Sequence, residues 1–322
     1  MALTSTPINE VITLLDKKSY LRHKLFQLFA INSIEGMKFY YHMGEKAQHP
    51  IFGKFYKRLM ETYYKYVHTS ALKLPLKDME AFIQGADHLS VGPCPCRLIF
   101  DREACEAPIF TCIRVNYFSQ TVTGLQDMVN EAREKKGLKP KKMGKELTRD
   151  QAVELVRHAY KQNLVLSLES CIQPYQNNIC ACCPDCCIEL NLRYKFGLDV
   201  CKSGPYFPVL SPDTCTGCGE CEDRCPVDAI TMDGGKPLVS PETCLGCGHC
   251  ADVCTTDSMV LEIKPERVPD YQEPGILKTS FVLALTGMMY LLFLRYTSTH
   301  KSENYKYGKA KPRKSDLIRP EE

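Results

Sequence analysis

The chain has 322 residues, of which 44% are apolar, and a formal net charge of only +3. This length and apolar content allow two or more compact domains with buried cores. The small charge, without a basic stripe that carries interleaved aromatic residues, argues against nucleic acid as a partner. The 19 cysteines are the compositional outlier. Because residues 1–20 include Asp16 and no continuous apolar run, we expect no secretory signal and interpret the thiols as metal ligands in a reducing compartment.

The first 90 residues have the pattern of helices. Apolar residues recur at near-helical spacing between residues 8 and 83, for example at Phe55, Leu59 and Tyr63. This pattern predicts an amphipathic bundle. We therefore expect a helical docking domain over residues 1–90.

A cysteine-rich region follows, expected as a metal-binding or cluster-binding domain over residues 91–205. It opens with Cys94-Pro95-Cys96-Arg97 and continues with Cys105 and Cys112. Four thiols within nineteen residues suffice for one metal centre. The prolines predict an extended backbone on which the thiols of the C-x-C pair share a face. Arg97 is either a hydrogen-bond donor to a cluster or an ordinary surface arginine.

The second half of this region predicts a helix, a strand and a dense cysteine run. Thr148-x-x-Gln151 is a capping-box signal for a helix through Tyr160, and residues 164–168 alternate like a short strand. Five cysteines within eight residues come next: Cys180, Cys182, Cys183, Cys186 and Cys187. A reducing compartment excludes a disulfide scaffold, and buried free thiols rarely cluster so tightly, so a further metal centre is favoured. Whether the upstream cysteines make one site or two stays open, and simple burial suffices for Cys171 and Cys201.

An internal repeat contains the remaining cysteines. Residues 211–232 recur as residues 240–261, with eleven identities that include all four cysteines of each copy. The copies run Cys215-x2-Cys218-x2-Cys221-x3-Cys225 and Cys244-x2-Cys247-x2-Cys250-x3-Cys254. Two residues between ligands let a tight turn present successive thiolates to adjacent corners of one cube, and the glycines of each copy permit close backbone approach. The repeat therefore predicts an iron–sulfur module.

This module resembles the bacterial dicluster ferredoxin, in which three close cysteines bind one cluster and the fourth reaches across to the other. The resemblance implies one [4Fe–4S] cluster on Cys215, Cys218, Cys221 and Cys254. It implies a second on Cys244, Cys247, Cys250 and Cys225, in a ferredoxin domain over residues 206–266. The alternative is a pair of zinc knuckles, but two such runs have no natural partition into zinc tetrahedra.

The chain also resembles a loosely described group of iron–sulfur proteins from anaerobic bacteria and archaea. The resemblance lies in the order of its motifs: a CxCR group, two spaced cysteines, a helix and a CxCCxxCC run ahead of a ferredoxin module. The resemblance covers residues 92–261. Its upstream part implies iron–sulfur binding and no particular activity.

Near the end of the chain, residues 279–294 form an uncharged run of sixteen residues, within a predicted transmembrane helix over residues 275–296. At roughly 1.5 Å per residue the run covers about 24 Å, a little less than a hydrocarbon core of about 30 Å. A buried core helix is the alternative. The basic tail over residues 297–322 favours the cytoplasm by the positive-inside rule, but a loaded cluster domain would need a dedicated export signal. We therefore expect a single-pass protein of the cell membrane with its cluster domains on the cytoplasmic face.

Together these features predict an α+β chain with an N-terminal helical domain, a cysteine-rich metal domain, a ferredoxin-like dicluster domain and one C-terminal transmembrane helix. The expected function is a membrane-anchored electron-transfer subunit that relays single electrons, with two [4Fe–4S] clusters and one or two further iron–sulfur clusters. The expected partners are a cytoplasmic electron donor or acceptor, the lipid bilayer and other subunits of a membrane redox complex, including one that handles a quinone or haem.

Two other interpretations of the upstream cysteines remain open. They could hold an unusual active-site cluster of an oxidoreductase that reduces a disulfide or a small substrate, or they could hold structural zinc. The sequence has no dinucleotide-binding glycine motif, Walker loop or convincing Ser/His/Asp set. An electron-transfer subunit is therefore the better prediction than a stand-alone catalyst.

Overall fold

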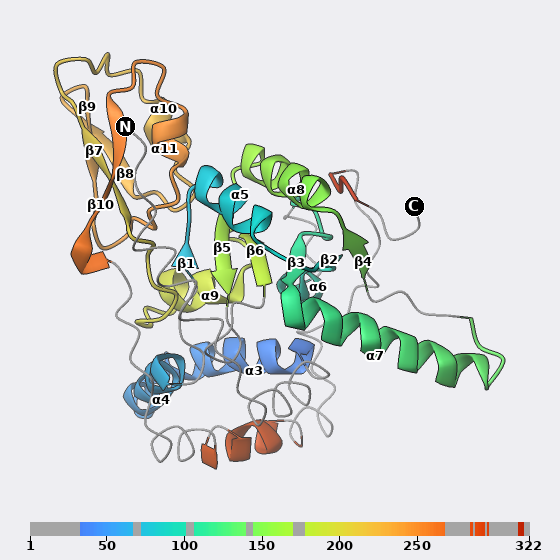
Figure 1. Ribbon diagram of the computed structural model, residues 1–322. Coiled ribbons are helices and arrows are strands. Elements are labelled where there is room, and N and C mark those ends of the chain that lie inside the picture. Colours follow the sequence, from blue (N-terminus) through green and yellow to red (C-terminus); the bar gives the residue numbers. More distant parts are fainter. Residues whose placement is uncertain are drawn as a thin grey trace.

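A six-stranded antiparallel sheet lies at the centre of the molecule (Figure 1). The computed structural model describes residues 33–66, 72–100, 106–139, 144–169, 178–267, 284–285, 287–293, 295 and 315–318. Every neighbouring pair of strands in the sheet is antiparallel. In spatial order the strands are β1 (Leu72–Lys73), β5 (Val165–Glu169), β6 (Asn178–Cys182), β3 (Cys112–Val115), β2 (Leu89–Gly92) and β4 (Lys145–Leu147).

Helices cover both faces of this sheet (Figure 1). One face carries α5 (Leu76–Gln84) and α8 (Arg149–Lys161), and the other carries α3 (Ser33–Lys46), α4 (Gly53–Tyr66), α9 (Ile188–Leu190) and the π-helix η1 (Asn191–Lys195). The side chains of β5 alternate between the two faces of the sheet. Leu166 and Leu168 belong to the core under α8, whereas Val165 belongs to the core over α3. Two hydrophobic cores therefore share one sheet.

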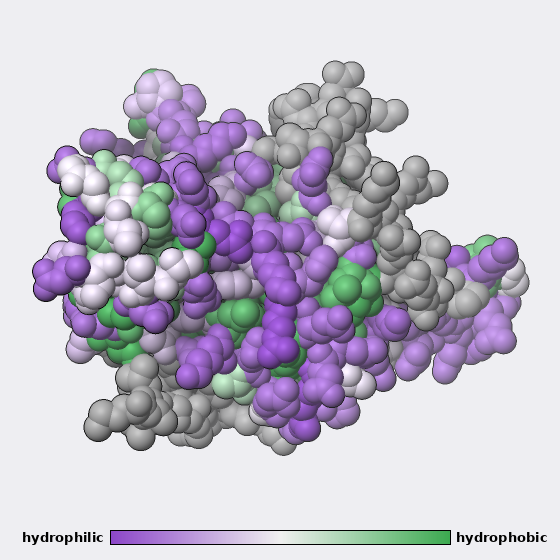
Figure 2. All heavy atoms as spheres, turned by 90° about the horizontal axis from the view of Figure 1, so that it is seen from above, coloured by the Kyte–Doolittle hydropathy of each residue, from purple (hydrophilic) through white to green (hydrophobic). Residues whose placement is uncertain are grey.

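Two further helices leave the sheet at its β2–β3 side. Helix α6 (Pro95–Phe100) follows β2, and α7 (Asn116–Glu134) follows β3 and extends away from the sheet (Figure 1). Seen from above, most of the surface is hydrophilic, and hydrophobic residues gather in small separate patches (Figure 2).

Residues 206–267 form a smaller unit beside α5 (Figure 1). Its elements are β7 (Tyr206–Leu210), α10 (Glu220–Asp223), β8 (Ile230–Asp233), β9 (Lys236–Val239), α11 (His249–Asp252), β10 (Met259–Ile263) and the 3-10 turn η2 (Pro265–Arg267). Strand β7 pairs with β10, and β8 pairs with β9, both antiparallel. The first and last strands of the unit thus lie side by side.

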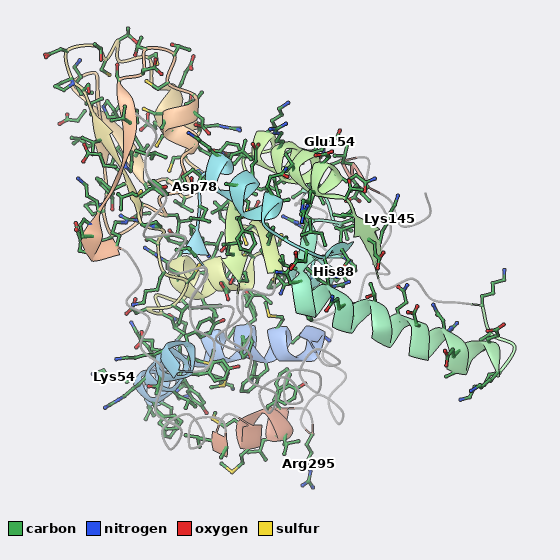
Figure 3. The ribbon with its side chains drawn as sticks, in the orientation of Figure 1. Lys54, Asp78, His88, Lys145, Glu154 and Arg295 are labelled. Carbon is green, nitrogen blue, oxygen red and sulfur yellow. The ribbon has the colours of Figure 1, made fainter. Side chains whose placement is uncertain are left out.

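The apolar run near the C-terminus packs against α3. Of the predicted helix over residues 275–296, the structure describes residues 284–285, 287–293 and 295, and all of these are helical. Phe293 is buried, and the centre of the Phe39 ring on α3 lies 5.7 Å from the centre of the Phe293 ring and 5.6 Å from that of Tyr290. One side of the run therefore covers aromatic side chains of α3, while Arg295 lies at the lower edge of the molecule (Figure 3).

No helix within the described ranges is long and apolar enough to cross a membrane. The prediction of a transmembrane helix over residues 275–296 is therefore wrong. The predicted location, a single-pass protein of the cell membrane with its cluster domains on the cytoplasmic face, is wrong for the same reason. Hydropathy misled the prediction because an uncharged run suits the aromatic surface of another helix as well as it suits lipid.

Two local predictions are confirmed. Thr148 caps α8 with a complete capping box: its side chain accepts from the Gln151 backbone N–H at 3.2 Å, and the Gln151 side chain accepts from the Thr148 N–H at 3.0 Å. The alternating residues 164–168 correspond to β5. Capping satisfies two backbone N–H groups that the first turn of a helix leaves without partners.

Replacing Thr148 with alanine should destabilise the start of α8 by about 1 kcal/mol, because the Gln151 N–H loses its acceptor. Amide hydrogen exchange at Gln151 should then quicken roughly fivefold where opening is local. Thr148→Ser keeps the acceptor and should exchange at nearly the wild-type rate. Equal rates in the wild type and the alanine variant would contradict the capping role.

Candidate metal centre

The sequence repeat is also a repeat of backbone conformation. Gly217 and Gly246 both have a φ of 72°, and each is followed two residues later by a left-handed glycine that is the N-cap of α10 or α11. Asp228 and Asp257 both have a φ of 52°. The same loop and turn therefore occur twice, 29 residues apart, and each half presents its cysteines in the same way.

The fourth cysteine of the first half lies with the cysteines of the second half. One cavity of the small unit is lined by Cys225, Cys244, Cys247 and Cys250. Its remaining walls are mostly apolar and include Leu245. A cysteine of the first half thus lines the same cavity as three cysteines of the second half.

Gly246 lies where two stretches of backbone approach closely. A Cβ atom at this position would lie 2.3 Å from the carbonyl oxygen of Tyr206, and the positive φ already disfavours any other residue. In the first half, a Cβ atom at Gly217 would lie 2.5 Å from the carbonyl oxygen of Gly235. Glycine at these two positions lets the cysteine loops fold tightly against the neighbouring strands.

The two sets of thiols differ in exposure. Cys244, Cys247 and Cys250 are buried, whereas Cys218 is exposed. Burial raises the pKa of Cys247 to about 12 and also raises the pKa of Cys250, because a thiolate loses its hydration inside the protein. Four soft donors that open on one buried cavity suit iron, which neutralises the thiolate charge.

Backbone N–H groups donate to the fourth cysteine of each half. The Ala229 N–H donates to the Sγ of Cys225 at 3.2 Å. Burial alone would raise the pKa of Cys254, but backbone N–H groups, that of Met259 foremost, donate to its sulfur and lower the pKa. Such donors stabilise the thiolate form that binds metal.

An aromatic stack joins the small unit to the sheet. The Tyr160 ring on α8 lies over the His249 ring on α11, with 3.9 Å between centroids and 14° between planes. The Tyr160 hydroxyl donates to the Asp252 carboxylate at 2.7 Å. Asp78 on α5 accepts a hydrogen bond from the Tyr206 hydroxyl (Figure 3). The sequence analysis missed these residues, because their contacts join positions far apart in the chain and no motif marks them.

The upstream cysteines divide between the two faces of the sheet. The core on the α3 side contains Cys94, Cys96, Cys180, Cys182, Cys187 and Cys201. The core on the α8 side contains Cys183 and Cys186, whose Sγ atoms are 3.0 Å apart. The predicted ligand Cys105 lies outside the described residues, as does Cys171. The predicted upstream ligands that the structure describes therefore do not converge on one point.

Every described cysteine carries a free thiol. Among the residues that the structure describes, no three or more His, Cys, Asp or Glu side chains are arranged to hold a single metal ion.

The C-x-C pair does not lie on an extended backbone. Helix α6 begins at Pro95, so Cys96 lies in its first turn while Cys94 precedes it. Proline suits the first position of a helix, because the N–H that it lacks would have no partner there. The two thiols consequently leave the chain from different local conformations.

Arg97 is buried and ties α6 to its surroundings. Its guanidinium donates to the carbonyl oxygens of Pro108 at 2.8 Å and Ala181 at 2.7 Å, and to the Thr111 hydroxyl at 2.6 Å. It is therefore not a surface arginine, and these bonds hold the Cys96 turn against β6.

Comparison with known proteins concerns the small unit. Residues 207–255 match the family model described as "4Fe-4S dicluster domain". This part of the chain is a dicluster ferredoxin segment. Over 77 residues the chain is 34% identical to the ferredoxin-type protein NapF of Escherichia coli strain K12, and equally to that of Escherichia coli O157:H7. These alignments cover 24% of the chain and 44% of each relative, so the chain spans less than half the length of the curated relatives it matches. No solved structure matches the chain.

Gly246→Ala should lower the iron bound by the ferredoxin segment, because the added Cβ would collide with the Tyr206 carbonyl and the strained φ would cost about 1–3 kcal/mol. Iron per chain after anaerobic reconstitution measures the effect. Gly219→Ala is the matched control, because Gly219 also has a positive φ but has no atom within 4 Å of the added Cβ. If both variants lose iron equally, the close approach at Gly246 is not the cause.

Proposed function

We propose that the chain is an electron-transfer protein that holds two [4Fe–4S] clusters by crossed ligation. One cluster would be bound by Cys215, Cys218, Cys221 and Cys254. The other would be bound by Cys244, Cys247, Cys250 and Cys225. The observation that carries this proposal is the cavity that Cys225 shares with the three close cysteines of the other half.

The residues around the two cysteine sets fit this role. A bound [4Fe–4S] cluster supplies one-electron redox chemistry, and the protein sets its potential and access. The buried set is shielded from water by apolar walls, and the N–H of Ala229 donates to Cys225 from outside the ligand set. The surroundings of the two cysteine sets therefore differ in polarity. Such a difference can give two clusters of the same type different reduction potentials.

Exposure indicates where a partner would dock. Cys218 is exposed, and Asp213, Glu220 and Asp223 beside it are exposed carboxylates. Complementary charge steers redox partners to each other, so the partner face is expected to be basic. We propose that other subunits of a redox complex exchange electrons with this exposed side. The relatives' description as ferredoxin-type proteins supports this assignment.

Cys225→Ser tests the crossing. The variant should lose about four of the irons that the ferredoxin segment binds, because one cluster loses a ligand. Under crossed ligation, Cys225→Ser combined with Cys244→Ser should lose no more iron than Cys225→Ser alone, since both residues serve one cluster. Cys225→Ser combined with Cys218→Ser should lose the iron of both clusters.

Iron and acid-labile sulfide per chain, with the electron paramagnetic resonance of the reduced protein, report these losses. Cys254→Ser provides the reciprocal test. Combined with Cys218→Ser it should lose no more iron than either single variant, and combined with Cys244→Ser it should lose the iron of both clusters. If Cys254→Ser instead loses the iron of both clusters with Cys218→Ser and of only one with Cys244→Ser, each half holds its own cluster.

A further inference from the structure

We propose that a third iron–sulfur cluster binds on the α3-facing side of the central sheet, within a series of six thiols that the ferredoxin segment does not use. The series consists of Cys94, Cys96, Cys112, Cys180, Cys182 and Cys187. The proposal does not depend on how the ferredoxin segment binds its own clusters.

Three of these thiols come from two paired strands of the sheet. Cys180 and Cys182 are two residues apart on β6, so alternation puts them on one face, opposite Ser167 and Val165 of β5. The pairing of Ile113 with Ile179 continues by one step to set Cys112 beside Cys180. The pairing of the strands therefore places the three thiols next to one another.

The other three thiols reach the same place from helix starts. Cys94 immediately precedes α6, Cys96 lies in its first turn, and Cys187 is the N-cap residue of α9. These three thiols share the core on the α3 side with Cys180 and Cys182. Four separate elements thus bring their thiols to one side of the sheet.

A buried positive charge accompanies this series. The Lys73 side chain is fully buried, and its Nζ donates to the Ser167 hydroxyl at 2.8 Å, on the strand position that faces Cys180. Its ammonium also lies 3.3 Å from the Glu169 carboxylate. A lysine is rarely fully buried without a reason. An anionic cluster on the same face would add to the stabilisation that Glu169 alone provides.

The number of donors favours a cluster over zinc. A structural zinc ion takes four ligands, whereas this series offers six soft donors. An iron–sulfur cluster spreads its thiolate ligands over several iron atoms, so it suits donors that extend along a sheet. Cys183 and Cys186 are excluded from the site, because they pack in the core on the opposite face.

The test uses the full chain, purified and reconstituted without oxygen, with iron, acid-labile sulfide and zinc measured per chain. The wild type should hold about twelve irons, of which about eight belong to the ferredoxin segment. Cys182→Ser combined with Cys187→Ser should hold about eight. Cys183→Ser combined with Cys186→Ser is the matched control on the same stretch of chain, and it should keep about twelve.

A second variant separates this proposal from the proposed function and from misfolding. With Cys215, Cys218, Cys244 and Cys247 all changed to serine, about four irons with sulfide should remain, with the Mössbauer signature of a cluster. Wild-type protein with about eight irons, zinc in place of the remainder, or a serine-substituted ferredoxin segment that leaves no iron would overturn the third site. Loss of iron in the control pair equal to that in the test pair would also overturn it. A wild-type chain that holds only about four irons, all of which the Cys182→Ser and Cys187→Ser pair removes, would instead refute the proposed function.

Discussion

The antiparallel pairing of β7 with β10 is the constraint on which the ferredoxin segment depends. Strand β7 precedes the first cysteine loop and β10 follows the last, so their pairing folds the two halves of the repeat face to face. The pairing of β8 with β9 closes the other side. In this arrangement Cys225 lines one cavity together with Cys244, Cys247 and Cys250. Packed strands hold these thiols close together, and bound iron would neutralise the charge that they take on as thiolate ligands.

The sequence predicted the features of the structure that depend on a few adjacent residues. The cysteine spacing, the capping box at Thr148 and the alternation before Glu169 each depend on a few adjacent residues, and they reappear in the structure. Helix α7 escaped prediction, because its sequence contains Gly124 and several β-branched residues that weaken helix propensity. The apolar run around Phe293 was misassigned, because its partner Phe39 lies far away in the chain.

The division of the upstream cysteines was equally hidden in the sequence. The sequence of residues 180–187 shows that cysteines are dense there, but it does not show which face of the sheet each side chain lies on. Strand β6 ends inside this run, at Cys182. Beyond that point a turn carries Cys183 and Cys186 to the other face before α9 returns Cys187 to the first. The end of β6 therefore decides which thiols lie on the same face. The position of that end depends on the pairing of β6 with β5 and β3.

The ferredoxin segment and the sheet are held in close register at Gly204. Its N–H donates to the Leu245 carbonyl at 2.8 Å, and a Cβ atom here would lie 1.9 Å from the Lys73 carbonyl oxygen. Leu245 and Cys247 belong to the same hydrophobic core as Cys182. This contact leaves no space for a side chain at Gly204. The two units are therefore packed directly against each other at this point, so an insertion here would disturb the packing far more than an insertion in a surface loop.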